Sequence, residues 1–195
     1  MSSVENQIKE YDYLHNEISQ KIELHNKLIT FTITTVVAIL SFALSKDNYL
    51  LYLMPFGIIL PISMRIAYYR SAMAKLSAYM IVFLEDHIDG LKWESRNTPL
   101  INDHTCMASK SDKTYKVLNT LPNYECLVLS IVCYILYFVN YINGREFHVT
   151  TVINAAWPLI FILIECIITH LINSIDKQKT AWIKYWQMLK ERKNE

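Results

Sequence analysis

The chain has 195 residues, of which 52% are hydrophobic and 19% charged, and its 19 basic and 18 acidic side chains give a formal net charge of +1. This balance excludes a strong bulk attraction to nucleic acid or acidic substrates, and so apolar a composition excludes a disordered chain. Only three residues are glycine, which argues against Gly-rich phosphate loops and dinucleotide-binding folds.

The first predicted element is an amphipathic cytoplasmic helix over residues 1–27 that leads into a membrane span at 28–45. A 4-3-4-3 spacing links Val4, Ile8, Tyr11, His15, Ile18, Ile22, His25 and Ile29. This period near 3.5 is typical of helices that pack in a bundle. Residues 28–45 carry no charge, and a bilayer span needs about 20 mostly apolar residues. With no A-x-A cleavage site in view, we expect this span to stay as a signal anchor.

A second span is predicted at 49–68, followed by a cytoplasmic helix and loop at 69–123. The link at 46–48 is so short that the first two spans form a tight hairpin. The bundle spacing returns in Ile62, Ile66, Tyr69, Met73, Leu76, Met80, Phe83 and His87. We therefore expect the second span to continue as a helix into the cytoplasm, ending near Gly90.

The third and fourth spans are predicted at 125–143 and 149–172, joined by another short link, and an amphipathic cytoplasmic tail follows at 173–195. The bundle spacing appears a third time in Ile168, Ile172, Ile175, Lys179, Trp182, Trp186 and Leu189. The predicted fold is all-α: an integral membrane protein with four transmembrane helices, arranged as two hairpins in a single membrane domain with helical cytoplasmic extensions.

The distribution of basic residues predicts the orientation of the spans. Seventeen of the 19 lysines and arginines lie in the N-terminal tail, the middle segment and the C-terminal tail, whereas the two outer links hold only Lys46 and Arg145. By the positive-inside rule, both termini and the middle segment are cytoplasmic. No sizeable segment is then left outside the membrane, which argues against an extracellular receptor.

Glu165 is the sharpest candidate for a functional residue, because ionisable groups inside spans are costly and often mark function. Arg65 and Glu165 both lie 16 residues from the outer ends of their spans, about 24 Å into a core of about 30 Å. One interpretation pairs them, within or between chains, with His170 about one turn deeper. Another has each side chain snorkel separately to the headgroups, and a third gives them a part in proton or ion translocation.

Other polar side chains suggest a wet path through the spans or hydrogen bonds between helices. They are Thr30, Thr32, Thr34, Thr35, Ser41, Ser130, Asn140 and Asn154.

The candidate partner-binding residues lie on the predicted cytoplasmic helices. His15, His25 and His87 would form a pH-responsive or ligand-binding cluster, or serve as ordinary polar residues of a bundle. Trp182 and Trp186, four residues apart on a lysine-rich tail, suit either a helix on the inner membrane surface or one that packs on the N-terminal helix.

No motif points to an enzyme. The four cysteines form no C-x-x-C pair, and no catalytic arrangement of nucleophile and base is recognisable. Asp103, His104 and Cys106 are too short a cluster to predict a metal site. We therefore expect no catalytic residues, no bound metal and no cofactor.

Several stretches resemble a loose group of small, mostly uncharacterised bacterial multi-span membrane proteins. These are residues 11–18 (YDYLHNEI), 22–28 (IELHNKL), 65–70 (RIAYYR), 83–85 (FLE) and 92–94 (KWE), and the resemblance covers about residues 10–95. Some members accompany anti-phage defence genes, where small multi-span proteins perturb membranes. The resemblance implies an inner-membrane protein of a defence or stress system.

The leading hypothesis is a non-enzymatic inner-membrane protein that forms homo-oligomers and perturbs the bilayer when a cytoplasmic protein partner or signal engages its helical extensions. A membrane scaffold that tethers a soluble partner is the first alternative. A small ion- or proton-coupled transporter is the second. No nucleic-acid partner is predicted.

Overall fold

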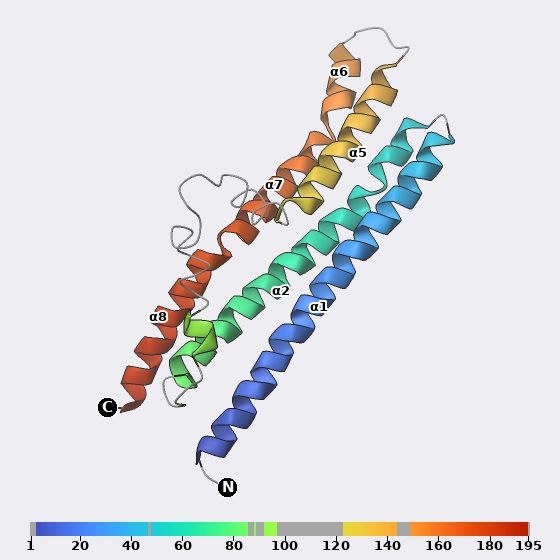
Figure 1. The fold of residues 1–195 in the computed structure, drawn as a ribbon. Helices are drawn as coiled ribbons and strands as arrows, with labels where there is room; N and C mark the ends of the chain where they lie inside the picture. Colours follow the sequence, from blue (N-terminus) through green and yellow to red (C-terminus); the bar gives the residue numbers. More distant parts are fainter. Residues whose placement is uncertain are drawn as a thin grey trace, which may run out of the picture. The chain divides into compact units, whose positions relative to one another are not determined.

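The computed structural model describes residues 3–46, 48–85, 88, 92–96, 123–143 and 149–194, and all regular structure in them is helical. The predicted all-α class is confirmed for this part of the chain (Figure 1). The elements in order are α1 (Ser3–Leu44), the 3-10 helix η1 (Tyr49–Leu53), α2 (Phe56–Phe83), α5 (Glu125–Ile142), α6 (Val149–Ala156), α7 (Leu159–Asn173) and α8 (Ile175–Asn194).

Four helices in the described ranges are long and apolar enough to cross a membrane, as predicted, and they indicate a membrane location. By length and composition these are Val4–Leu44, Tyr49–Phe83, Glu125–Ile142 and Thr151–Asn173. The predicted outer link at 145–148, most of the predicted loop at 69–123, and the candidate residue His87 lie outside the described residues.

Prolines interrupt two of the predicted spans. The second begins with η1, where the Asn48 side chain accepts a hydrogen bond from the backbone N–H of Leu50 at 3.0 Å, and α2 starts only after Pro55. The fourth span is predicted as one helix over 149–172, but in the structure it is divided in two. Its first helix, α6, ends at Ala156, and its second, α7, begins at Leu159. Pro158 lies between them, and proline has no N–H for the helical ladder.

The chain divides into two compact units. The tail unit comprises Met1–Leu24, Tyr68–Thr120 and Ile172–Glu195, and the span unit comprises His25–Ala67 and Leu121–Leu171. Both α1 and α2 begin in one unit and end in the other without a break in the helix.

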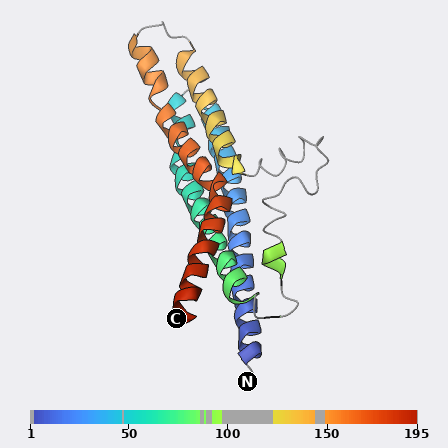
Figure 2. The same ribbon diagram turned by 90° about the vertical axis from the view of Figure 1, so that its left-hand side faces the viewer.

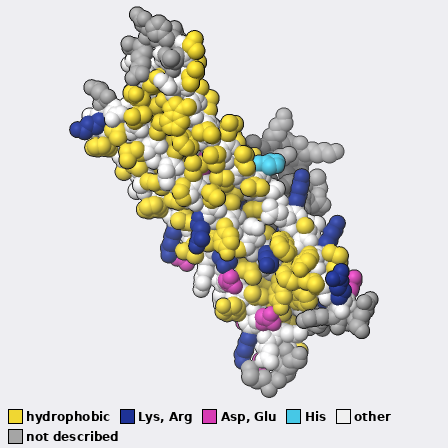
Figure 3. Space-filling view, turned by 180° about the vertical axis from the view of Figure 1, so that it is seen from behind, with side chains coloured by type: hydrophobic (Ala, Val, Ile, Leu, Met, Phe, Trp, Pro, Cys, Tyr) yellow, Lys and Arg dark blue, Asp and Glu magenta, His cyan; other side chains and the backbone are white. Residues whose placement is uncertain are grey.

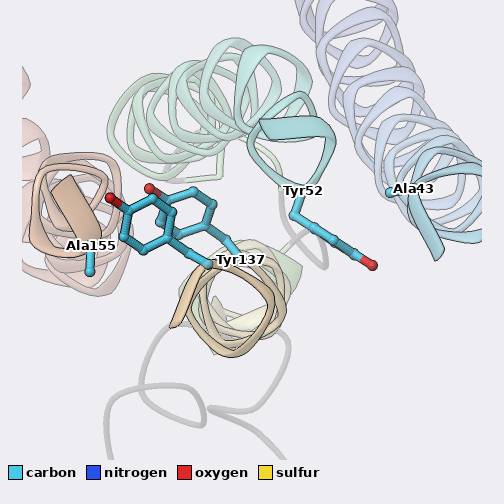
Figure 4. Close-up of a cluster of buried hydrophobic side chains, with 5 residues drawn as sticks. Ala43, Tyr52, Tyr137 and Ala155 are labelled. Carbon is cyan, nitrogen blue, oxygen red and sulfur yellow. The ribbon is translucent and has the colours of Figure 1, made fainter. Parts of the chain in front are cut away.

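The core of the span unit contains a tyrosine-rich cluster in which Tyr137 is 1% exposed and Ala43 is fully buried (Figure 4). The Tyr137 hydroxyl donates a hydrogen bond to the backbone carbonyl of Asn154 at 2.8 Å. Figures 1 and 2 both show α5 beside α6, which agrees with this bond. The other buried members of the cluster are Tyr52, Tyr141 and Ala155.

A second buried cluster of the span unit lies one to two helical turns further along the same helices. Its members are Val36, Phe56, Ile59 and Cys133. The ring of Phe56 stacks on that of Phe161 with centroids 5.1 Å apart, so α7 also packs against this apolar layer.

The outer surface of the span unit is largely apolar, as expected for lipid contact. Figure 3 shows hydrophobic side chains gathered at the end of the molecule that carries α5 and α6. Exposed apolar residues include Phe31, Val37, Phe42, Val128, Val139, Ile160, Leu163 and Ile167. Three hydroxyls on α1, those of Thr30, Thr34 and Ser41, donate to carbonyls four residues earlier in the same helix. These three hydroxyls are thus satisfied within α1.

The tail unit has a core of its own, where α1 meets the last turns of α2. Tyr11, Met80 and Leu84 are buried there, with Leu14, Ile18 and Tyr79 packed around them. The hydroxyl of Tyr79 also donates a hydrogen bond to the Glu10 carboxylate at 2.9 Å.

Candidate functional site

Glu165 lies on α7 with no exposed surface. Its Oε1 is 2.6 Å from the Oγ of Ser63 on α2, which donates a hydrogen bond to it. The same Ser63 Oγ lies 3.0 Å from the backbone carbonyl oxygen of Leu60, a second acceptor. The other carboxylate oxygen, Oε2, is buried and has no hydrogen-bond partner among the described residues.

Glu165 belongs to a level of buried polar side chains to which four helices of the span unit contribute one residue each. We call this level the polar layer, and its members are Thr32 on α1, Ser63 on α2, Ser130 on α5 and Glu165 on α7. Each lies three or four residues along its helix from a residue of the second buried cluster or, for Glu165, from Phe161, which packs against that cluster. The neighbours in the cluster are Val36, Ile59 and Cys133. Residues at this spacing share one helix face, so the polar layer is the next layer of the same core.

The polar layer is not fully hydrogen-bonded. The Thr32 hydroxyl donates to the carbonyl of Leu28 at 2.7 Å, but the Ser130 Oγ, like Glu165 Oε2, is buried without a partner in the described part of the chain. Buried polar atoms in native proteins almost always have a partner in protein or water. The layer therefore has the chemistry to bind a proton, a water molecule or a small cation.

Arg65 and His170 both lie on exposed faces of their helices, whereas Glu165 is fully buried. Ser63 and Arg65 are two residues apart on α2, which turns their side chains about 200° from each other. Because Ser63 faces Glu165, Arg65 points elsewhere. The pairing of Arg65 with Glu165, expected within or between chains, stays a prediction, and sequence reasoning missed Ser63 as the partner.

A buried ion pair lies in the tail unit. The ammonium of Lys179 on α8 is 3.2 Å from Oε2 of Glu94, and their side chains are only 11% and 10% exposed. The hydroxyl of Ser77 on α2 donates a hydrogen bond to the same carboxylate oxygen. Glu94 therefore connects α2 with α8.

Glu85 holds the helical turn at residues 93–96 that presents Glu94. The Glu85 carboxylate is 1% exposed and accepts hydrogen bonds from the backbone N–H groups of Glu94, at 2.6 Å, and Ser95, at 2.8 Å. It also accepts one from the Ser95 hydroxyl. The Glu85 carboxylate thus binds the free N–H groups at the start of this turn, as the side chain of an N-cap residue does.

The tryptophans of α8 pack against α2 in the tail unit. The ring of Trp186 meets those of Tyr79 and Phe83 edge-on, with centroids 5.6 and 6.0 Å apart. The Lys75 ammonium lies 5.0 Å from the centre of the Trp182 ring. The sequence offered the membrane surface or the N-terminal helix as the neighbour of these residues. In the structure these tryptophans contact α2, because the apolar stripe of α2 continues as far as Phe83.

The two described candidate histidines do not form a cluster. His15 is exposed and stacks on Tyr11 with ring centroids 6.3 Å apart. His25 is half-buried, and its Nδ1 lies 3.2 Å from Oδ1 of Asn26. Ten residues of α1 separate the two, about 15 Å of helix.

Within the described ranges no group of three or more His, Cys, Asp or Glu side chains is placed to hold a metal ion. Asp103, His104 and Cys106 lie outside these ranges. Comparison of the chain with protein-family models, with curated proteins and with solved structures found no match.

Proposed function

We propose that this chain is a non-enzymatic protein of a bacterial inner membrane that serves in anti-phage defence or a stress response. A cytoplasmic partner or signal acts on the tail unit, and the spans respond by altering the integrity of the bilayer. The observation that carries this proposal is the continuity of α1, with 42 residues, and α2, with 28 residues, through both units. An unbroken helix transmits a displacement of one end to the other.

The positive-inside rule supports a cytoplasmic tail unit and cytoplasmic termini, since 17 of the 19 basic residues belong to the segments on that side. Cysteines introduced singly at exposed positions of the tail unit should react with a membrane-impermeant maleimide only after the cells are opened. Labelling in intact cells would overturn this orientation.

The tail unit offers a surface for the partner or for a second copy of the chain. Apolar side chains on its part of α1 are exposed, including Val4 at 48% and Ile8 at 39%. These two lie four residues apart and so share one helix face. Exposed apolar groups in a segment outside the bilayer mark an interaction surface when they adjoin.

Membrane potential in bacterial cells tests the proposed function. Cells that produce the full chain with its genetic neighbours are followed with a potential-sensitive dye under triggering conditions. We expect depolarisation with the natural chain and its loss in Ile8→Lys, while both proteins reach the membrane in equal amounts. Asn16→Lys is the matched control, because Asn16 is an exposed polar residue of the same helix. An unchanged potential with the natural chain would overturn the proposal.

A small proton-coupled transporter is the second candidate, and the polar layer around Glu165 favours it. Its signature would be uptake or release of a substrate driven by a pH gradient, without collapse of the potential. If the tail unit instead captures a soluble partner and neither flux nor potential changes, the chain is the tethering scaffold considered above.

A further inference from the structure

Among the described residues, no cation forms an ion pair with Glu165. Its only polar contact among the described residues is Ser63, and it has no exposed surface. Burying an ionised carboxylate without a positive partner is far more costly than burying the neutral acid. Ionisable groups inside a membrane span are costly for the same reason.

The hydrogen bonds around Ser63 also favour a protonated Glu165. The Ser63 hydroxyl has one hydrogen but lies within hydrogen-bond distance of two acceptors, Glu165 Oε1 at 2.6 Å and the Leu60 carbonyl at 3.0 Å. If Glu165 is ionised, one of these two contacts lacks a hydrogen. If Oε1 carries a proton, it donates to Ser63, Ser63 donates to Leu60, and both contacts are filled. The 2.6 Å separation is normal for an O–H···O bond.

We propose that Glu165 and Ser63 form a proton-binding site inside the span unit, and that the site is occupied at neutral pH. The proton lies on Oε1 of Glu165 and is shared with the Ser63 hydroxyl. Oε2 of Glu165 and Oγ of Ser130, both buried without partners in the described residues, mark the polar layer as the place where water delivers or removes the proton. This site is a property of the spans at rest and does not depend on the defence role proposed above.

Each of the four helices that contribute to the polar layer carries other titratable or charged groups toward the same end. They are His25 and Lys27 on α1, Arg65 on α2, Glu125 and Cys126 on α5, and Cys166 and His170 on α7. None of them is in hydrogen-bond or ion-pair contact with Glu165 in this structure. Loss of the proton would leave a buried charge with which none of these groups is in contact, and the pairing of Arg65 with Glu165 stays a prediction.

Infrared spectroscopy of the full chain in lipid nanodiscs tests the site, because a protonated carboxylic acid has a C=O stretching band that a carboxylate lacks. We expect this band at neutral pH in the natural chain, its loss at alkaline pH, and its absence from Glu165→Gln. In Ser63→Ala the band should persist but shift in frequency, since the acid loses its hydrogen-bond partner. Glu5→Gln is the control, because Glu5 is half exposed and paired with Lys9, and it should leave the band unchanged.

Two outcomes would overturn the proposal. The first is the same carboxylic-acid C=O region in the natural chain and Glu165→Gln at neutral pH, which would mean that Glu165 is ionised. The second is a band that stays at the natural frequency in Ser63→Ala, which would refute the shared proton. This second comparison decides the question if Glu165→Gln does not fold.

Discussion

Replacing Lys179 with methionine should loosen α8 in the tail unit. The Lys179 ammonium lies 3.2 Å from Glu94, and both side chains are about nine-tenths buried. Methionine keeps the length and apolar stem of lysine but removes the charge. Glu94 would then lose the ammonium at 3.2 Å, while the Ser77 hydroxyl still donates to its carboxylate.

Removing one partner of a buried ion pair costs about 3–5 kcal/mol, because the other charge stays buried without compensation. We expect the lower end, about 3 kcal/mol, since the 11% and 10% exposure of the two side chains lets water reach the pair. Every 1.4 kcal/mol is a factor of about ten in an equilibrium constant. The local opening of α8 should therefore become about 100-fold more frequent.

Amide hydrogen exchange of α8, measured by mass spectrometry on the full chain in nanodiscs, reads this opening directly. The matched control is Lys9→Met, which breaks an ion pair of nearly equal length, 3.1 Å, between side chains that are 61% and 50% exposed. That change should cost no more than about 0.5 kcal/mol. The double variant Lys179→Met with Glu94→Gln should return most of the lost protection, because no buried charge remains.

The reasoning is refuted if Lys179→Met affects exchange in α8 no more than Lys9→Met affects exchange in α1. It is also refuted if the double variant exchanges as fast as Lys179→Met alone. In either case Glu94 would not depend on Lys179 for compensation of its charge.

Three further changes test the packing of each unit. Ala43→Leu overfills the fully buried tyrosine-rich cluster and should destabilise the span unit by about 1–3 kcal/mol, seen as a lower midpoint of thermal unfolding; an unchanged midpoint would mean that the cluster is loosely packed. Tyr137→Phe deprives the Asn154 carbonyl of its 2.8 Å donor and should cost about 1 kcal/mol by the same measurement, whereas a stabilised protein would contradict the bond. Trp186→Leu removes two edge-on ring contacts worth about 0.5–1.5 kcal/mol each, so exchange should rise in α8, and no rise would place the ring outside the core.

The spans were predictable because charge and hydropathy act over long stretches. A run of about 20 residues without charge has few structures open to it other than a buried or membrane-spanning helix. The bundle spacing was informative in the same way, since it included Tyr11 and Met80, which are buried in the tail unit. It also included Val4 and Ile8, which are exposed. The spacing shows that residues share one face of a helix, but it does not show how far along that face the neighbouring helix extends.

The candidate site was only half predictable. The cost of a carboxylate in a span singled out Glu165, but its contact with Ser63 depends on how α2 is rotated about its axis. Depth made Arg65 one candidate partner, and sequence alone did not reveal that Ser63, two residues away on α2, lies on the face toward Glu165. The capping role of Glu85 was invisible for a similar reason, since it depends on where the helical turn at residues 93–96 lies relative to the end of α2, which no local pattern encodes.

Glu94 and Glu165 are both buried, but they differ in what balances a negative charge, and this difference assigns them different roles. Glu94 has an ammonium 3.2 Å away, so its charged form is stabilised, and it acts as a fixed link between α2 and α8. Among the described residues Glu165 contacts a serine hydroxyl and no cation, and the neutral acid costs less to bury than the carboxylate. The charge at Glu165 therefore depends on whether a proton can reach it. A signal that opens the span unit to water would change the charge of α7 at this residue.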